Sequence, residues 1–557
     1  MTDPTPLLSI SDLSVVFRSR AGDIPAVSGV TFDVHAGRTV AVVGESGSGK
    51  STTAAAVNRL LPGAGRITSG RVLFDGRDLA SLSESEMVAV RGAHIGFVPQ
   101  DPMSNLNPLM RVGNQIAEAL EVHGRTSGAA TRAAVVELLD MVGISDPEQR
   151  LHQYPHEFSG GMRQRVLIAM GLACRPRLLI ADEPTSALDV TVQRKILDEL
   201  DRLVGRLGTA VMLITHDLGL AAERADTIVV MNKGRVVELG TAEQILDSPQ
   251  DAYTRRLLDA APSLTSAQWV RSVPTGKSGG GPTGDAQGAT APVAAPLVEV
   301  CGLSKTYTMR SSRTGSSREV VAVSEVSFTI PRGRTVSLVG ESGSGKSTTA
   351  NIVLGLETAS GGQVRFDGVD IAPLSRRELF AFRRRIQPVF QNPYASLDPR
   401  YTVEESVAEP MRVHRVGDKR ARRARVATLL DQVALPDALA SRLPHELSGG
   451  QRQRVAIARA LALSPEIVVL DEAVSALDVI VQAQILELLA TLQAELGLSY
   501  LFISHDLAVV RMISDEVHVM KNGRVVESGS PDELFARPQE EYTRELLAAI
   551  PGGRRVG

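Results

Sequence analysis

The chain contains one twelve-residue sequence twice, and this exact repeat constrains its fold more than any other feature. VGESGSGKSTTA occupies 43–54 and, letter for letter, 339–350. Weaker matches flank it in the same order in both halves, namely AVSGVTF (26–32) with AVSEVSF (322–328) and LITHDL (213–218) with FISHDL (502–507). A repeat held in register over this length predicts two copies of one fold in tandem.

Length and composition agree with this organisation. The 557 residues suffice for several domains, and we expect a first domain at 1–270, a flexible Gly/Pro/Ala-rich linker at 271–297 and a second domain at 298–557. The net charge of -3 excludes a bulk attraction to nucleic acid or anionic lipid. Two cysteines exclude a disulfide framework and a cysteine-rich zinc site, which favours a reducing compartment.

No segment of the sequence suggests a targeting peptide or a membrane span. The start, MTDPTPLLSI, has neither a basic region nor an apolar core. The longest apolar stretches, such as AVMLI at 210–214, have the length of strands. We therefore expect a chain that does not cross a membrane by itself.

The repeated sequence has the pattern of a phosphate-binding loop. GESGSGKS at 44–51 and 340–347 fits G-x-x-x-x-G-K-S, in which glycines allow backbone N–H groups to surround a phosphate chain. Lys50 and Lys346 are expected to reach the β and γ phosphates, and the hydroxyls of Ser51 and Ser347 to coordinate Mg²⁺. The candidate ATP-binding residues of the two loops are Gly44, Glu45, Ser46, Gly47, Ser48, Gly49, Lys50, Ser51 and Thr52, and Gly340, Glu341, Ser342, Gly343, Ser344, Gly345, Lys346, Ser347 and Thr348.

A pair of carboxylates follows a second apolar run in each copy. LLIADE at 178–183 and IVVLDE at 467–472 read as buried strands of an α/β fold that end in Asp-Glu. Asp182 and Asp471 are the candidates for holding the metal. Glu183 and Glu472, one residue further on, are the candidates for polarising the attacking water.

With SGGM at 159–162 and SGGQ at 448–451, the chain resembles the ATP-binding cassette (ABC) ATPases over nearly its whole length. The resemblance implies an α/β fold of two tandem ABC-type P-loop nucleotide-binding domains, each with a RecA-like core, an antiparallel β part and a helical subdomain. It also implies a head-to-tail arrangement in which each ATP lies between one phosphate loop and the other domain's signature motif. Ser159, Gly160 and Gly161 would then contact the nucleotide on the second loop, and Ser448, Gly449, Gly450 and Gln451 that on the first.

The same resemblance assigns further residues. Gln100 and Gln391 are similar to the glutamine that senses Mg²⁺ and water, and His216 and His505 to the histidine that contacts the γ-phosphate. Phe17 and Tyr307 match the aromatic residue that stacks on adenine. Met162 stands where the second copy has Gln451, so we expect two unequal sites that both hydrolyse ATP.

The end of each copy resembles a narrower family. NKGRVVELGTAEQILDSPQDAYTRRLL at 232–258 and KNGRVVESGSPDELFARPQEEYTRELL at 521–547 are similar to the ATPases of oligopeptide and dipeptide importers, a family that includes nickel and glutathione importers. This implies an ATPase that energises peptide import on the cytoplasmic face of the membrane, with two integral permeases and, through them, an extracytoplasmic solute-binding protein. PSLTSAQW at 262–269 lacks the cysteines of relatives with an iron–sulfur cluster, so none is expected.

Two alternatives share the catalytic motifs. A soluble twin-cassette ATPase that acts on ribosomes would have a long, charged, helical connector, unlike the Gly/Pro-rich linker expected here. A DNA-repair cassette ATPase is disfavoured because zinc-type cysteine sets and a basic field are missing. The basic run KRARRAR at 419–425 is expected to be a solvated helix face, so nucleic acid is not an expected partner.

Overall fold

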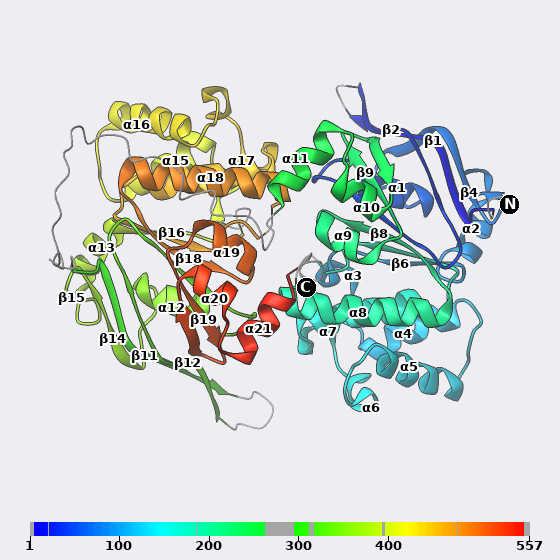
Figure 1. Ribbon diagram of the computed structural model, residues 1–557, viewed down its shortest axis with the longest axis horizontal. Helices are drawn as coiled ribbons and strands as arrows, with labels where there is room; N and C mark the ends of the chain where they lie inside the picture. The colour runs from blue at the N-terminus through cyan, green and yellow to red at the C-terminus, as the bar shows by residue number, and fades with distance from the viewer. Residues whose placement is uncertain are drawn as a thin grey trace. The chain divides into compact units, whose positions relative to one another are not determined.

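The computed structural model describes residues 5–19, 22–185, 188–261, 295–310, 317–392, 396–475 and 477–550. They form two compact units, one with the elements up to α11 and the other with those from β11 onward (Figure 1). Most of the predicted linker 271–297 lies outside the described residues. So does the segment 262–269, on which the expected absence of an iron–sulfur cluster rests.

Two sheets form the first unit. A four-stranded antiparallel sheet has the order β2-β1-β4-β5, and a six-stranded sheet has the order β10-β9-β3-β8-β7-β6, in which only the edge strand β10 is antiparallel to its neighbour. The strands are β1 (Leu8–Ser19), β2 (Gly22–Val34), β3 (Thr39–Val43), β4 (Gly65–Phe74), β5 (Arg77–Asp78), β6 (Ile95–Val98), β7 (Leu178–Asp182), β8 (Ala210–Thr215), β9 (Thr227–Asn232) and β10 (Arg235–Gly240). The apolar runs read from the sequence are therefore the central, fully buried strands of a parallel sheet.

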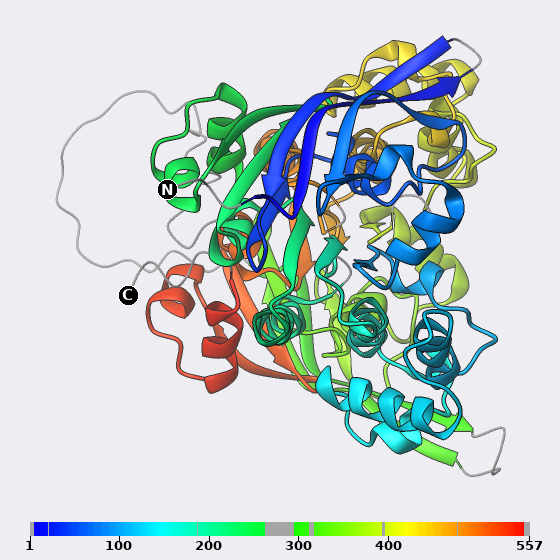
Figure 2. The same ribbon diagram turned by 90° about the vertical axis from the view of Figure 1, so that its right-hand side faces the viewer.

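The helices of the first unit fall into a core group and a separate helical group. They are α1 (Lys50–Val57), α2 (Glu84–Val90), α3 (Pro102–Asn105), α4 (Val112–Glu121), α5 (Ala129–Met141), α6 (Pro147–Arg150), α7 (Gly160–Leu172), α8 (Val190–Leu207), α9 (Leu218–Arg224), α10 (Ala242–Asp247) and α11 (Ala252–Ala260). Helices α4, α5 and α7 pack on one another, and Figure 2 shows α5 and α6 (cyan) well away from β1 and β2 (blue). Their apolar residues share one core with the inner face of α8.

The second unit repeats this topology. Its sheets have the orders β12-β11-β14-β15 and β16-β17-β18-β13-β19-β20. The strands are β11 (Val298–Arg310), β12 (Ser317–Ile330), β13 (Thr335–Val339), β14 (Gly361–Phe366), β15 (Val369–Asp370), β16 (Ile386–Val389), β17 (Ile467–Asp471), β18 (Ser499–Ser504), β19 (Glu516–Lys521) and β20 (Arg524–Gly529). The helices are α12 (Lys346–Val353), α13 (Arg376–Arg385), α15 (Val403–Val413), α16 (Lys419–Gln432), α17 (Gly449–Leu461), α18 (Val479–Leu496), α19 (Leu507–Ile513), α20 (Pro531–Ala536) and α21 (Glu541–Ala548). The run KRARRAR lies on α16, and most of its residues are exposed.

Helix α18 corrects the expectation that every long apolar stretch is strand-sized. Within the described ranges it is the one helix long and apolar enough to span a membrane by length and composition alone. It occupies the place that the amphipathic helix α8 has in the first unit. Ile485, Leu486, Leu489 and Leu492 are buried in the core of the second unit. A helix that is apolar on most sides is also typical of a core position.

A buried histidine distinguishes the second core from the first. His518 on β19 stands where β9 has Val229, its Nδ1 lies 2.7 Å from Ser528 Oγ, and its ring packs on Phe328. The Oε1 atom of Glu516 lies 3.4 Å from Nε2 of this histidine. Burial lowers the pKa of His518 from 6.5 to about 4, so the folded unit holds this ring neutral.

This histidine makes the stability of the second unit depend on pH. Because the folded pKa lies below the unfolded pKa, its contribution is complete above about pH 6.5 and is lost as the pH falls toward 4. We expect the free energy of unfolding of His518→Val, relative to that of the wild type, to increase by roughly 3 kcal/mol when the pH is lowered from 7 to 4. Urea unfolding of both proteins across this pH range measures the difference, and a gap that is constant with pH would contradict the assignment.

Candidate functional site

Each phosphate loop requires glycine at its first and last glycine positions. Gly44 has φ +154°, and a Cβ placed there would lie 2.2 Å from the carbonyl oxygen of Met231 on β9. Gly49 has φ +101°, and its Cβ would lie 2.9 Å from the carbonyl oxygen of Ala26. Gly340 and Gly345 lie equally close to backbone carbonyl oxygens in the second unit. The loop is therefore in close contact with the neighbouring backbone. Helix α1 or α12 begins at the lysine that follows its last glycine.

The loop lysines are buried and bind the loop itself. Lys50 is 4% exposed, and its Nζ donates to the carbonyl oxygens of Gly44 at 2.7 Å and Glu45 at 2.8 Å. Lys346 makes the same bonds to Gly340 and Glu341 at the same distances. Burial lowers the pKa of Lys50, and the negative charges of Glu183 and Asp182 offset part of this decrease. An ammonium group is thus held at the mouth of each loop, where a phosphate chain can replace the carbonyl groups.

A serine and an aspartate meet beside each loop. Ser51 Oγ lies 3.0 Å from Asp182 Oδ1, and Ser347 Oγ lies 3.2 Å from Asp471 Oδ1. Burial raises the pKa of Asp182 to about 6 and also raises that of Asp471. Hydroxyl and carboxylate oxygens are the ligands Mg²⁺ prefers, and Mg²⁺ commonly takes one or two protein ligands together with water and phosphate. This donor set fits the ion.

Two side chains from distant parts of the sequence meet at the glutamate after β7. Gln100 Nε2 donates to Glu183 Oε2 at 2.8 Å, and His216 Nδ1 lies 3.4 Å from the same oxygen. Glu183 itself has φ +43°, in the left-handed region that non-glycine residues rarely adopt. Its N–H donates to the carbonyl oxygen of Ile214 on β8, which holds this conformation in place.

The second unit reproduces this cluster in detail. Gln391 Nε2 donates to Glu472 Oε2 at 2.6 Å, His505 Nδ1 lies 3.5 Å from that oxygen, and Glu472 has φ +47°. The two glutamates share this backbone conformation, and the repeated contacts with a glutamine and a histidine are what mark each cluster as a candidate site.

The charges of the cluster favour an ionised glutamate. Burial alone would raise the pKa of Glu183, but His216, Lys50 and Gln100 outweigh it and hold the pKa below its ordinary value. Burial likewise opposes the charged form of His216, yet the contact with Glu183 raises its pKa. The same balance holds for Glu472 and His505. Each site therefore contains a carboxylate that can accept a proton or orient water.

The signature residues begin helices. Ser159 caps α7 by accepting from the Met162 N–H at 3.4 Å, and Gly160 and Gly161 form its first turn. A Cβ on Gly161 would lie 2.7 Å from Val192 Cγ1 on α8. Glycine thus occupies the first two positions of this helix in each unit, where the N–H groups have no partner within the helix.

The second signature has a more complete cap. Ser448 accepts from the Gln451 N–H at 3.3 Å, and the Ser448 N–H donates to Gln451 Oε1 at 2.9 Å, while Gly449 and Gly450 follow the cap. Met162 has no side-chain oxygen for the reciprocal bond. The structure therefore gives Gln451 a local capping contact, and a direct role toward nucleotide stays a prediction, as does the pairing of each signature with the opposite loop.

The two predicted adenine-stacking residues have different surroundings. Phe17 is partly buried beside Gly65 and packs against the core of the first unit. Tyr307 donates its hydroxyl to Glu357 Oε2 at 2.7 Å, and Lys305 Nζ lies 5.0 Å from its ring centroid. The stacking role stays a prediction for both rings.

Sequence reasoning missed one pair of residues at the loops. Tyr253 accepts a hydrogen bond from the Glu45 N–H at 2.9 Å, and Tyr542 accepts one from the Glu341 N–H at 3.0 Å. The repeated YTR at 253–255 and 542–544 was the available signal. Its connection to the loop depends on how the chain returns after β10 and β20, which spacing does not indicate.

Comparison with known proteins shows the family of the chain. The family model described as ABC transporter matches residues 27–186 and 323–475, and the model described as oligopeptide/dipeptide transporter, C-terminal region, matches residues 237–278. The peptidoglycan transport ATP-binding protein YejF of Agrobacterium fabrum is 48% identical over 98% of this chain and 97% of its own. The glutathione import ATP-binding proteins GsiA of Salmonella choleraesuis and of Escherichia coli K12 are each 46% identical over 99% of this chain and 90% of their own.

The chain belongs to the ABC transporter family. Within it, the chain is an ATP-binding ATPase with two tandem cassettes in one polypeptide.

Proposed function

We propose that this chain is the energy-coupling ATPase of a membrane importer for peptides, with two ATP sites that drive two permease subunits. The observation that carries the proposal is the convergence of Gln100, Glu183 and His216 behind one phosphate loop and of their counterparts behind the other. The peptide cargo is supported by the family match at 237–278 and by relatives named for peptidoglycan and glutathione transport.

The residues of each cassette divide the work of hydrolysis. The loop N–H groups and Lys50 bind the phosphates, and Ser51 with Asp182 would hold Mg²⁺, an ion that neutralises charge developing on the phosphate oxygens. Glu183 orients water for attack, with His216 and Gln100 fixing its carboxylate. Lys346, Ser347, Asp471, Glu472, His505 and Gln391 do the same in the second cassette. Each signature helix start then closes on the nucleotide of the opposite cassette.

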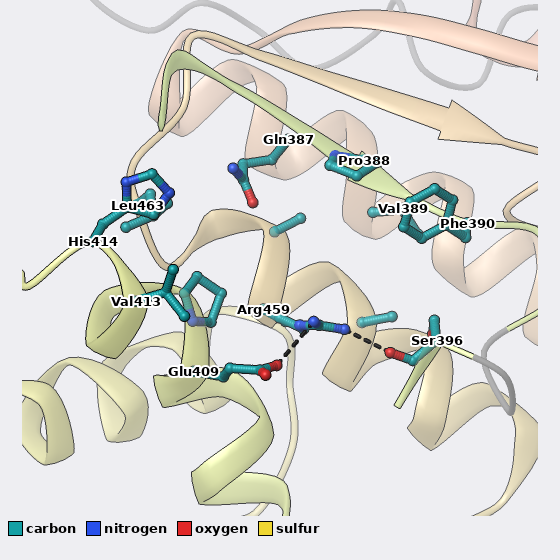
Figure 3. Close-up of a pocket in the computed structure, with 13 residues that line it drawn as sticks. Gln387, Pro388, Val389, Phe390, Ser396, Glu409, Val413, His414, Arg459 and Leu463 are labelled. Atoms are coloured by element: carbon teal, nitrogen blue, oxygen red, sulfur yellow. Dashed lines mark hydrogen bonds and ion pairs between the residues drawn. The ribbon is translucent and has the colours of Figure 1, made fainter. Parts of the chain in front are cut away.

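The permeases are proposed to dock beside the two glutamines. In the second unit a hollow lies between β16, α15 and α17, and Figure 3 shows its lining, with Phe390 directly before Gln391 in the chain. Arg459 lies across it, 2.9 Å from Glu409 Oε2 and 2.6 Å from the carbonyl oxygen of Ser396. Phe390 and Val413 expose 42% and 54% of their surface at its edge. A permease helix seated here would act on Gln391 through its neighbour Phe390.

Purification from membranes tests the proposed function. The tagged full-length chain, isolated from gently solubilised membranes, is expected to bring along two integral permeases, and the solute-binding protein associated with them would identify the cargo. This result would also place the chain at the cytoplasmic face of the membrane as a peripheral subunit. Ribosomes without permeases would overturn the proposal in favour of a twin-cassette translation factor.

A single charge in the hollow is expected to uncouple the chain from its permease. Val413→Asp places a carboxylate on an apolar contact surface, where burial against a partner would cost several kcal/mol. We expect at least a tenfold loss of co-purified permease, with the ATPase rate of the isolated chain unchanged. Val369→Asp is the matched control because Val369 is similarly exposed, at 57%, but lies on β15. Equal permease recovery from both variants would contradict the docking site.

A further inference from the structure

The peptide group that opens each phosphate loop is held from both sides. Its carbonyl oxygen, on Gly44, accepts from Lys50 Nζ at 2.7 Å, and its N–H, on Glu45, donates to Tyr253 Oη at 2.9 Å. In the second cassette the Gly340–Glu341 peptide is held by Lys346 and Tyr542 at 2.7 and 3.0 Å. Lys50 is expected to turn toward phosphate when nucleotide binds, which leaves the tyrosine as the other side chain hydrogen-bonded to this peptide.

The tyrosines are placed by a structure that both cassettes share. Tyr253 is 4% exposed near the start of α11, and Tyr542 is 5% exposed near the start of α21. Figure 1 shows α20 and α21 (red) together beside β19. Burial raises the pKa of Tyr253 to about 12, so its hydroxyl stays neutral at physiological pH.

A carboxylate on the last strand fixes the turn that leads to each tyrosine. Glu238 on β10 accepts from the N–H groups of Gln250 at 2.7 Å and Asp251 at 3.1 Å. Glu527 on β20 accepts in the same way from Gln539 and Glu540 at 2.8 and 3.2 Å.

An arginine of each YTR segment closes the same turn. Arg255 donates to the carbonyl oxygens of Pro249 and Gln250, and Arg544 to those of Pro538 and Gln539. The repeated PQxxYTR sequence thus encodes a turn, a tyrosine that reaches the loop, and an arginine that stabilises the turn.

We propose that Tyr253 and Tyr542 are positioning residues that keep each phosphate loop open for ATP, so that the C-terminal helices of each cassette set its nucleotide affinity. The inference rests on the ATP-binding role of the loops and adds that the C-terminal helices control the affinity of the loops for ATP. Without the hydroxyl, the partly buried Glu45 N–H loses its partner, and the first peptide is free to turn when Lys50 leaves it. Apparent affinity falls in proportion to the fraction of loops in the binding conformation.

The test is the double variant Tyr253→Phe with Tyr542→Phe in the full-length chain. We expect KM for ATP and the Kd of a non-hydrolysable ATP analogue to rise about tenfold, equivalent to roughly 1.4 kcal/mol, with kcat changed less than twofold. Unchanged KM and Kd would overturn the proposal. A loss of kcat at unchanged Kd would also overturn it, while co-purification of the permeases would still support the proposed role in import.

A tyrosine outside the phosphate loops serves as a control that distinguishes positioning of the loop from the general stability of the fold. Tyr500 is 1% exposed and donates its hydroxyl to the carbonyl oxygen of Leu489, inside the second core. Tyr500→Phe removes one buried hydrogen bond there, so it is expected to lower the melting temperature with KM unchanged. An equal rise in KM in this variant would show that destabilisation alone explains the effect.

The turn carboxylates test whether the whole C-terminal structure acts through the tyrosines. Glu238→Ala with Glu527→Ala is expected to raise KM in the same direction. When these changes are added to the phenylalanine variant, KM should rise by less than a further twofold. Both sets of changes remove the same interaction, the hydrogen bond between the tyrosine and the loop. Fully multiplicative effects would show that the turn and the tyrosine act separately.

Discussion

Replacing Glu183 and Glu472 together by glutamine is expected to lower steady-state ATP turnover at least 100-fold while ATP still binds. Glutamine keeps the size of the side chain and can still accept from Gln100 Nε2, which lies 2.8 Å from Glu183 Oε2. It loses the negative charge that orients water and accepts its proton, and general-base catalysis contributes about 10² to 10⁴ in rate. Phosphate release under saturating Mg-ATP measures turnover, and equilibrium binding of a fluorescent ATP analogue measures affinity.

The single variants and a surface control complete this experiment. Each single variant is expected to fall severely in turnover, since the two sites are proposed to act in one cycle. Glu137→Gln, on an exposed position of α5, removes the same charge outside both clusters of site residues and should keep the wild-type rate. A double variant that hydrolyses ATP at the wild-type rate would remove both glutamates from the mechanism.

The sequence predicts those parts of the fold that depend on local chemistry. The loop glycines, the apolar strands and the Asp-Glu pair appear as patterns because each needs particular residue types at fixed spacing. The convergence of Gln100 and His216 on Glu183 could not be obtained in this way, since the three residues come after β6, β8 and β7 respectively. From the sequence, only the resemblance to the ABC ATPases assigned these three residues to one site.

Other features depend on tertiary contacts that no local pattern records. The hydrogen bond of Tyr253 requires α11 to return to the loop after β10, and the left-handed backbone of Glu183 requires the neighbouring strand β8. The core of the second unit buries Leu486 and Leu489 of α18, although the sequence of this helix alone would also satisfy a membrane span. In each case the deciding partner lies far away in the chain.

Gly44→Ala is expected to destroy ATP binding at the first loop. The added Cβ would lie 2.2 Å from the Met231 carbonyl oxygen and 2.8 Å from Ser48 Oγ, so the loop has to move. Overpacking against backbone costs about 1–3 kcal/mol or more, and the left-handed φ adds about 1 kcal/mol. We expect at least a 100-fold loss of affinity for the ATP analogue at that loop, and the same from Gly340→Ala, whose Cβ would lie 2.1 Å from the Met520 carbonyl oxygen.

Two other glycines separate the clash from the cost of a left-handed conformation. Gly63 has φ +58° and Gly76 has φ +77°, both outside the loop and with open space around the Cβ position. Alanine at either is expected to cost about 1 kcal/mol of stability without the large loss of affinity.

The clash cannot be relieved by separating the two elements, because β3 and β9 are paired in parallel, with Val43 opposite Val230 immediately before Gly44 and Met231. Moving Met231 away would break this ladder and the antiparallel pairing of β9 with β10. The loop is the part that has to yield, and with it the N–H groups that bind phosphate. Affinity for ATP in Gly44→Ala equal to that in Gly63→Ala would show that the loop tolerates this shift, and that close approach to β9 does not determine its shape.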